Sequence, residues 1–158
     1  LVEGARSRIP DASITTDVIV GFPGETDLEF EESLAFIKEM NFAGGHVFRY
    51  SKREGTAAAK YPTQVTGKIA SDRARRTREI LERHERNFIA SQLNKELNVL
   101  WEACAETSSG NWRLEGYSEN YIRVSATASE NRWNKIDIVK TIKIDKAIIS
   151  GEIIQHRY

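Results

Sequence analysis

The sequence predicts an α/β region followed by an all-β region, with a long helix between them. Three observations support this fold class. Residues 1–67 carry a strand, helix, strand pattern, residues 68–93 contain neither proline nor glycine, and residues 94–158 hold five short β-rich runs. We therefore expect part of a parallel α/β fold, a connecting helix, and a small five-stranded antiparallel barrel, in that order.

The first strand is expected at residues 14–22, which are rich in β-branched side chains. Its Val18 to Val20 run is nearly continuous, as is typical of a parallel strand that is covered on both faces. Pro23 and Gly24 end it.

A helix should follow from Asp27 to Met40, because Thr26 and Glu29 have the spacing of a capping box. Gly44 and Gly45 end this stretch, and residues 46–50 resume as a strand, most simply parallel to the first through a right-handed crossover. The expected apolar stripe of the helix is Phe30, Leu34, Phe36, Ile37 and Met40.

One strand, helix, strand unit buries too little surface to be a domain. The missing strands are expected upstream in a longer parent protein, or else the exposed edge pairs with a second copy to give a dimer.

Residues 68–95 read as a helix with sparse apolar positions and six arginines. One interpretation is a solvated connecting helix with ion pairs such as Glu79 with Arg83 and Glu82 with Arg86. The other is contact with an RNA backbone, since arginine forks suit phosphate.

The last region changes to the period of β-strands, with polar breaks at residues 107–111 and 129–134. Such a pattern suggests a small, partly closed barrel of the oligonucleotide-binding kind. The expected strands are residues 97–103, 112–117, 121–126, 136–144 and 147–154.

Composition limits the function classes. The single cysteine, Cys104, excludes a disulfide framework and a cysteine-based metal cage formed by this chain alone, and it reads as a small apolar residue in a strand. No apolar run approaches the length of a membrane span, so we expect a soluble, cytoplasmic segment of a longer protein.

The net charge is zero, which does not favour a generic nucleic-acid binder. Lys plus Arg against Asp plus Glu number 7 and 10 in residues 1–67, 7 and 4 in residues 68–93, and 9 and 9 in residues 94–158. The positive surplus therefore lies in the central helix.

Two motifs follow the two expected strands: residues 16–26, TDVIVGFPGET, and residues 48–58, FRYSKREGTAA. Taken alone, the glycines of the first motif indicate a tight strand-to-helix turn. Together the motifs resemble the fifth and sixth strands of the radical S-adenosylmethionine (SAM) barrel in the methylthiotransferase family.

The last region carries a second resemblance, to the RNA-binding TRAM barrel at the C-terminus of these enzymes. It rests on residues 99–102 (VLWE), Trp112, residues 116–124 (GYSENYIRV) and residues 150–152 (SGE). For Trp101 and Trp133, core packing or an incidental surface position is favoured over RNA contact.

The resemblance implies a fragment of an enzyme that adds a methylthio group to a hypermodified adenosine next to the tRNA anticodon. SAM and 4Fe-4S clusters are implied for the full-length enzyme, whose N-terminal barrel and cluster domains would be partners of this segment. None of these cofactors is expected on this chain, and it should be inert alone because it lacks the cluster cysteines.

The motif positions also imply two sets of site residues. Arg53 is expected to pair with a carboxylate, either that of the cofactor or that of Glu25. The implied cofactor-binding set is Thr16, Asp17, Gly21, Glu25, Tyr50, Ser51 and Arg53. The implied RNA-binding set is Trp112, Tyr117, Asn120, Tyr121 and Arg123, of which the aromatic rings would stack on bases.

The sequence at residues 46–48, 52–56 and 64–65 is most similar to that of the branch that acts on threonylcarbamoyladenosine. The isopentenyladenosine branch, the branch that acts on a ribosomal protein, and a simple RNA-binding module are the alternatives. A nucleotide-binding α/β domain is weaker, because neither a Gly-x-Gly-x-x-Gly pattern nor a phosphate-loop lysine is present.

Overall fold

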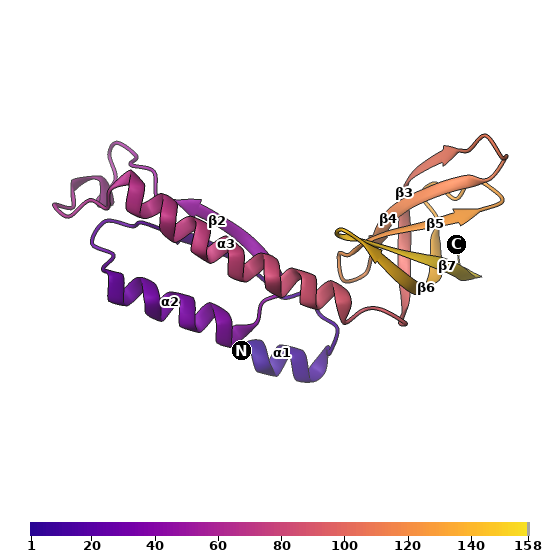
Figure 1. Ribbon diagram of the computed structural model, residues 1–158, viewed down its shortest axis with the longest axis horizontal. Helices are drawn as coiled ribbons and strands as arrows, with labels where there is room; N and C mark the ends of the chain where they lie inside the picture. Colours follow the sequence, from indigo (N-terminus) through magenta and orange to yellow (C-terminus); the bar gives the residue numbers. More distant parts are fainter. Residues whose placement is uncertain (158) are drawn as a thin grey trace. The chain divides into compact units, whose positions relative to one another are not determined.

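A computed structural model describes residues 1–157 of the chain. The chain divides into two compact units, Leu1–Glu85 and Arg86–Tyr158 (Figure 1). In the described part of the chain, no helix is long and apolar enough to cross a membrane.

The first unit is built on two parallel strands, β1 (Thr15–Val20) and β2 (Gly44–Arg49), in register with Val18 opposite Val47. It also contains α1 (Val2–Arg8), α2 (Asp27–Met40), the 3₁₀ turn η1 (Ala58–Lys60) and most of α3 (Gly67–Ala90). Helices α2 and α3 run side by side (Figure 1). The predicted strand, helix, strand order and the parallel pairing are confirmed.

The core of this unit joins β1, α2 and α3. Its buried side chains include Val20 of β1, Leu34 of α2 and Leu81 of α3. The other face of the two-stranded sheet is exposed, since Ile19 and Phe48 keep 59% and 51% of their surface accessible. The expectation of strands covered on both faces is therefore wrong for this chain, because both helices that bury the sheet share one core.

Helix α2 begins and ends as its sequence dictates. The Thr26 hydroxyl accepts the backbone N–H of Glu29, and the Glu29 carboxylate accepts the N–H of Thr26, so the predicted capping box is formed. Asn41 ends the helix in the left-handed conformation. Phe36 was wrongly placed in the apolar stripe, because it lies beside the buried face and stays 55% exposed.

Gly44 and Gly45 do not end the preceding stretch but form the start of β2. A Cβ on Gly45 would lie 2.2 Å from the carbonyl oxygen of Thr16, so a side chain there would hold the two strands apart. Gly45 is therefore a requirement of close strand pairing rather than a break.

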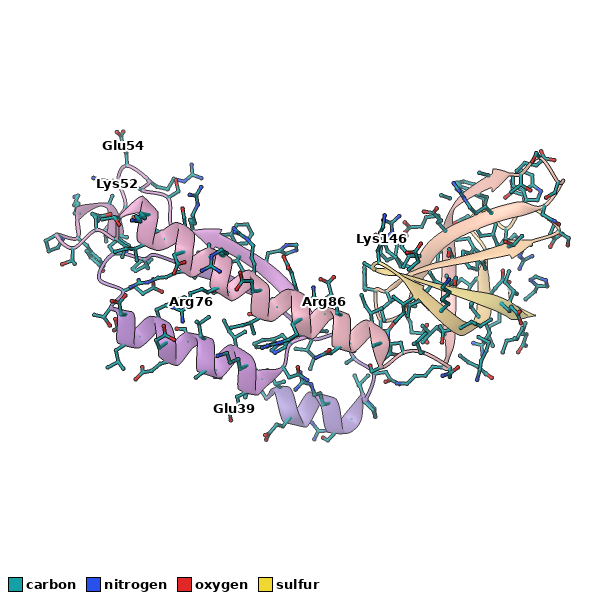
Figure 2. All side chains as sticks on the ribbon, viewed as in Figure 1. Glu39, Lys52, Glu54, Arg76, Arg86 and Lys146 are labelled. Atoms are coloured by element: carbon teal, nitrogen blue, oxygen red, sulfur yellow. The ribbon has the colours of Figure 1, made fainter. Side chains whose placement is uncertain are left out.

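Helix α3 ends at Ala90, before the expected Lys95, and Asn94 has a left-handed φ of 62° in the turn that follows. Its arginines stabilise the first unit: Arg76 pairs with Glu31 of α2 at 2.7 Å, and Arg78 donates to the carbonyl of Val47. Figure 2 labels Arg76 on α3. Helix α3 is thus packed into the core of the first unit rather than being a solvated connecting helix, and Glu79 pairs with Arg75 rather than with Arg83. Contact of this helix with an RNA backbone stays a prediction.

The second unit is a closed barrel with strand order β3-β4-β5-β7-β6. Its strands are β3 (Glu96–Glu106), β4 (Trp112–Ser118), β5 (Arg123–Ala128), β6 (Ile136–Asp145) and β7 (Ile148–His156). The prediction of five strands is confirmed. The prediction of an all-antiparallel, partly closed barrel is wrong, because the barrel is closed and one strand pair is parallel. Strand β7 inserts between β6 and β5 and closes the barrel through a short parallel pairing, Val124 with Ile149 and Ser125 with Ser150.

Trp101 is fully buried in the barrel core together with Val99, Leu114 and Val139. The sequence favoured core packing or an incidental surface position for this tryptophan over RNA contact, and core packing is what the structure shows. Cys104 lies on β3, partly buried against the same core.

Candidate cofactor and nucleic-acid sites

A cleft of about 540 Å³ lies at the carboxyl ends of β1 and β2. It is lined by Gly21, Val47, Phe48, Arg49, Tyr50, Ser51, Lys52, Gln64, Val65, Gly67 and Ala70. Gly21, Tyr50 and Ser51 are thus the members of the predicted cofactor set that the fold brings together. Lys52 and Glu54 mark the loop after β2 in Figure 2.

Gly21 and Tyr50 have the local properties of a ligand-binding turn. Gly21 has a φ of +73°, and a Cβ there would lie 2.7 Å from the Cβ of Ala70, so only glycine fits. The Tyr50 ring packs edge-on against Phe22, and its hydroxyl is buried without a hydrogen-bond partner among the described residues. A buried donor of this kind suits a polar ligand group in the cleft.

Glu25 belongs to a network that fixes the glycine-rich turn rather than to the cleft lining. Its carboxylate accepts the N–H of Gly21 at 2.6 Å and pairs with Arg73 of α3 at 2.5 Å. Burial alone would lower the pKa of Arg73, but the hydrogen bonds that its guanidinium donates to the carboxylates of Asp27 and Glu25 outweigh this effect, so the pKa is raised.

Arg53 does not pair with Glu25, contrary to one of the two predicted partners, because Arg73 occupies that carboxylate. Arg53 is exposed in the loop after β2, where its carbonyl oxygen accepts the hydroxyl of Thr56. Thr16 lines a different groove, beside α2, and Asp17 lies on the exposed sheet face opposite His46. Motif position placed these three in the cofactor set, and strand alternation and loop geometry put them outside the lining of this cleft.

The barrel carries the second candidate site, on the outer face of β3, β4 and β5. Leu100, Tyr117 and Arg123 are neighbours in register across these three strands, and each is exposed. Tyr121 lies in the turn between β4 and β5, 83% exposed, with its ring 6.3 Å from that of Tyr117. We call Leu100, Tyr117, Tyr121 and Arg123 the aromatic face.

Two arginines flank an acidic side chain beside this face. Glu115 lies 3.2 Å from Arg123 and 3.9 Å from Arg113. All three side chains are at least one-third exposed, so both ion pairs are open to exchange with another anion such as phosphate.

Three other aromatic or amide residues of the prediction have different environments. Asn120 is only 7% exposed, and its amide accepts the Ser118 hydroxyl and donates to Gln92, so it is an internal residue rather than a surface contact. Trp112 packs partly against the barrel core. Trp133 is 63% exposed, in the loop between β5 and β6.

Asp137 is a structural residue that the sequence reading missed. It is fully buried, and its carboxylate accepts hydrogen bonds from Trp101 at 2.7 Å and Arg132 at 2.6 Å and contacts the ring of His156 at 2.9 Å. Burial raises its pKa, but the hydrogen bonds from these three side chains together lower it below its usual value. The only available signal was an acidic residue between two isoleucines, Ile136 and Ile138, at the start of a strand.

No model of a protein family matches the sequence. Individual relatives do match: a threonylcarbamoyladenosine tRNA methylthiotransferase of Bacillus subtilis is 36% identical over 151 residues, which are 95% of this chain. The chain is related to the tRNA methylthiotransferases. A tRNA-2-methylthio-N(6)-dimethylallyladenosine synthase of Alkaliphilus oremlandii is 33% identical over 98% of the chain, and that of Thermobifida fusca is 40% identical over 84%.

This methylthiotransferase-related chain spans only part of the relatives it matches. It covers 33%, 32% and 25% of the proteins from Bacillus subtilis, Alkaliphilus oremlandii and Thermobifida fusca. The match runs through both units of the chain, so the cleft and the barrel belong to one related segment.

Proposed function

We propose that this chain is the segment of a tRNA methylthiotransferase that supplies part of the SAM-binding wall and the tRNA-binding barrel. The observation that carries the proposal is a 36% identical relative of that activity matching 95% of the chain. The cleft at the carboxyl ends of β1 and β2 agrees with it, since ligands of parallel α/β folds bind there.

In the first unit, Gly21, Tyr50 and Ser51 would hold the cofactor against the sheet. Bound in this cleft, SAM would supply the radical chemistry of the parent enzyme. This chain contributes binding and orientation: close approach of the backbone at Gly21 and a buried donor at Tyr50. A cluster held by three thiolates must take its ligands from elsewhere in the parent, because Cys104 is the one cysteine here.

In the second unit, the aromatic face would bind tRNA. Tyr117 and Tyr121 offer rings to bases, and Arg123 and Arg113 offer guanidinium groups to phosphates. The closed five-stranded barrel supports a TRAM-like domain in this unit. The unpaired edge of β1 would join the upstream strands of the parent, and in the isolated chain the same edge would favour a dimer.

The substrate that we propose is threonylcarbamoyladenosine next to the anticodon, because of the amino-acid sequences of the motifs after β1 and β2. The dimethylallyl derivative is the second candidate, because relatives with that name match at 33% and 40% identity. Sequence identity therefore does not separate the two substrates, and the proposal depends on the motifs.

Comparing tRNA nucleosides by mass spectrometry from cells with and without the parent gene tests the activity. We expect the methylthio form of threonylcarbamoyladenosine to disappear with the gene. Loss of the dimethylallyl product instead would keep the enzyme class and change the substrate, whereas an unchanged nucleoside profile would contradict the enzyme proposal.

The proposed binding of RNA by the barrel is tested with the chain itself. We expect it to bind tRNA weakly, with an affinity that falls steeply as salt rises, because phosphate neutralisation releases counterions. Replacing Tyr121 and Arg123 together should weaken binding more than replacing Trp133. Equal effects would place the RNA on another face of the barrel.

A further inference from the structure

The turn between β4 and β5 displays Tyr121 in a conformation that a tyrosine rarely adopts. Its φ is +62°, in the left-handed region, where Cβ crowds the following carbonyl oxygen. In residues 1–157, the other non-glycine residues with positive φ are Asn41, Asn94, Asn134 and Lys146. Asparagine tolerates this region because its short side chain bonds locally, but a tyrosine gains nothing of that kind.

The backbone on both sides of Tyr121 is fixed by hydrogen bonds. The N–H of Tyr121 donates to the carbonyl of Ser118 at 2.9 Å, and the N–H of Ser118 donates to the carbonyl of Ile122 at 3.0 Å. The N–H of Ile122 donates to the Ser118 hydroxyl oxygen at 3.0 Å. Ile122 is buried with Ile89 and Ile149, so the turn is attached to the hydrophobic interior.

A buried polar network lies beneath the turn. The Ser118 hydroxyl donates to Asn120 at 2.7 Å, and the Asn120 amide donates to the side chain of Gln92 at 3.2 Å. The backbone carbonyl of Gln92 in turn accepts the Thr141 hydroxyl at 2.7 Å. Gln92 is 1% exposed and Asn120 is 7% exposed, so these bonds form away from water and hold the turn in one arrangement.

The strain at Tyr121 is not offset by packing of its ring in the barrel core. It is 83% exposed, and its ring contact is with Tyr117, itself on the surface, at 6.3 Å. Strained residues cluster at binding sites, where the surrounding structure maintains a conformation whose cost is offset when a ligand binds. A strained and exposed aromatic residue on a rigid base fits this description.

We propose that Tyr121 stacks on an unpaired base of RNA, and that Ser118, Asn120 and Gln92 position its turn for this contact. This inference rests on the proposed RNA-binding function of the barrel. An unpaired base is specified because an exposed ring in a turn can reach a free base face, whereas bases in a duplex are already stacked on their neighbours. Asn120 is thereby a positioning residue rather than an RNA contact.

The test is to replace Tyr121 by Asn in the 158-residue chain and to measure binding to a single-stranded RNA and to a duplex RNA of equal length. We expect the affinity for the single strand to fall about ten-fold and that for the duplex to stay unchanged. The melting temperature should stay the same or rise, because asparagine relieves the strain at positive φ. Tyr121→Phe should bind like the wild type, and Trp133→Asn is the matched control for an exposed aromatic ring.

Each outcome has a defined meaning. A wild-type chain that binds neither RNA would contradict the proposed function together with this inference. A wild-type chain that binds while Tyr121→Asn binds equally well would overturn this inference alone. A lower melting temperature for Tyr121→Asn with unchanged binding would show that the ring is structural.

The positioning role is tested by Asn120→Ala, measured below its melting temperature. It should lower single-strand affinity in the wild-type background and cause no further loss in the Tyr121→Asn background, because its effect acts through that ring. An equal loss in both backgrounds would overturn the positioning role. Tryptophan fluorescence shows whether the variant barrel is folded, since Trp101, Trp112 and Trp133 all lie in it.

Discussion

The guanidinium of Arg73 on α3 lies 2.5 Å from the carboxylate of Glu25, which follows the glycine-rich turn after β1. The same guanidinium bonds to the Glu25 carbonyl at 2.9 Å and to Asp27 at 2.7 Å. The Glu25 carboxylate also accepts the N–H of Gly21. Arg73 thus joins the helix to the turn that borders the candidate cofactor cleft.

Arg73→Ala should destabilise the first unit by about 3 kcal/mol, because it leaves the largely buried Glu25 carboxylate without its cation. Circular dichroism at the helix band follows this unit, while tryptophan fluorescence follows the barrel alone. Arg75→Ala is the matched control: its pairs with Asp72 and Glu79 are exposed and should be worth less than about 1 kcal/mol. Equal losses from both variants would show that the Arg73 pair has no special weight.

How much of this network the sequence could predict depends on how far apart the interacting residues lie along the chain. The capping box of Thr26 and Glu29, helix α2 and the left-handed freedom at Gly21 are local, and the sequence predicts them. The partner of Glu25 lies 48 residues away on α3, whereas the candidate that the sequence offered was Arg53, in the motif after β2. Choosing Arg73 requires the packing of α3 beside α2, which residue spacing alone does not fix.

The barrel shows the same division. Strand number follows from hydrophobic alternation, but the insertion of β7 between β5 and β6 depends on long-range pairing. Asn120 was expected to contact RNA because of its place in the motif of residues 116–124. The partners that make its burial favourable, Ser118 and Gln92, are recognisable only from the fold.

Glu115 should limit RNA binding by the aromatic face, because it holds Arg123 and Arg113 and repels phosphate. We expect Glu115→Gln to raise RNA affinity about two- to five-fold, which is the value of an exposed ion pair. Fluorescence anisotropy with labelled RNA measures this. Glu106→Gln is the control, since it changes the net charge equally at an exposed position on β3 rather than on β4. A matching gain in affinity there would assign the effect to overall charge.

Asp137→Asn should destabilise the barrel by about 2–4 kcal/mol, since it weakens bonds from Trp101, Arg132 and His156 to a buried carboxylate. Because the pKa of Asp137 is lowered in the fold, its contribution is present above the unfolded value of about 3.9 and is lost as pH falls through the folded pKa. Denaturation followed by tryptophan fluorescence should show a smaller loss of stability in acid for Asp137→Asn than for the wild type. Parallel pH profiles would contradict the assigned role.

His84 should make the first unit sensitive to mild acid. It is 7% exposed, its Nδ1 has no hydrogen-bond partner among the described residues, and burial, with Arg83 and Arg6 nearby, lowers its pKa. The unfolded chain therefore takes up a proton first, so the free energy of unfolding should fall as pH drops below about 6.5. His84→Gln should flatten the profile between pH 7 and 5 in circular dichroism melts, and an unchanged slope would rule out His84 as its source.

Mass analysis of tRNA after reaction with the anaerobically reconstituted parent enzyme tests the central claim most directly. We predict a methylthio group on threonylcarbamoyladenosine next to the anticodon, in a reaction that consumes SAM, and a reduced yield when the parent carries Tyr121→Asn. A reconstituted parent with intact clusters that leaves every tRNA nucleoside unmodified would contradict the account.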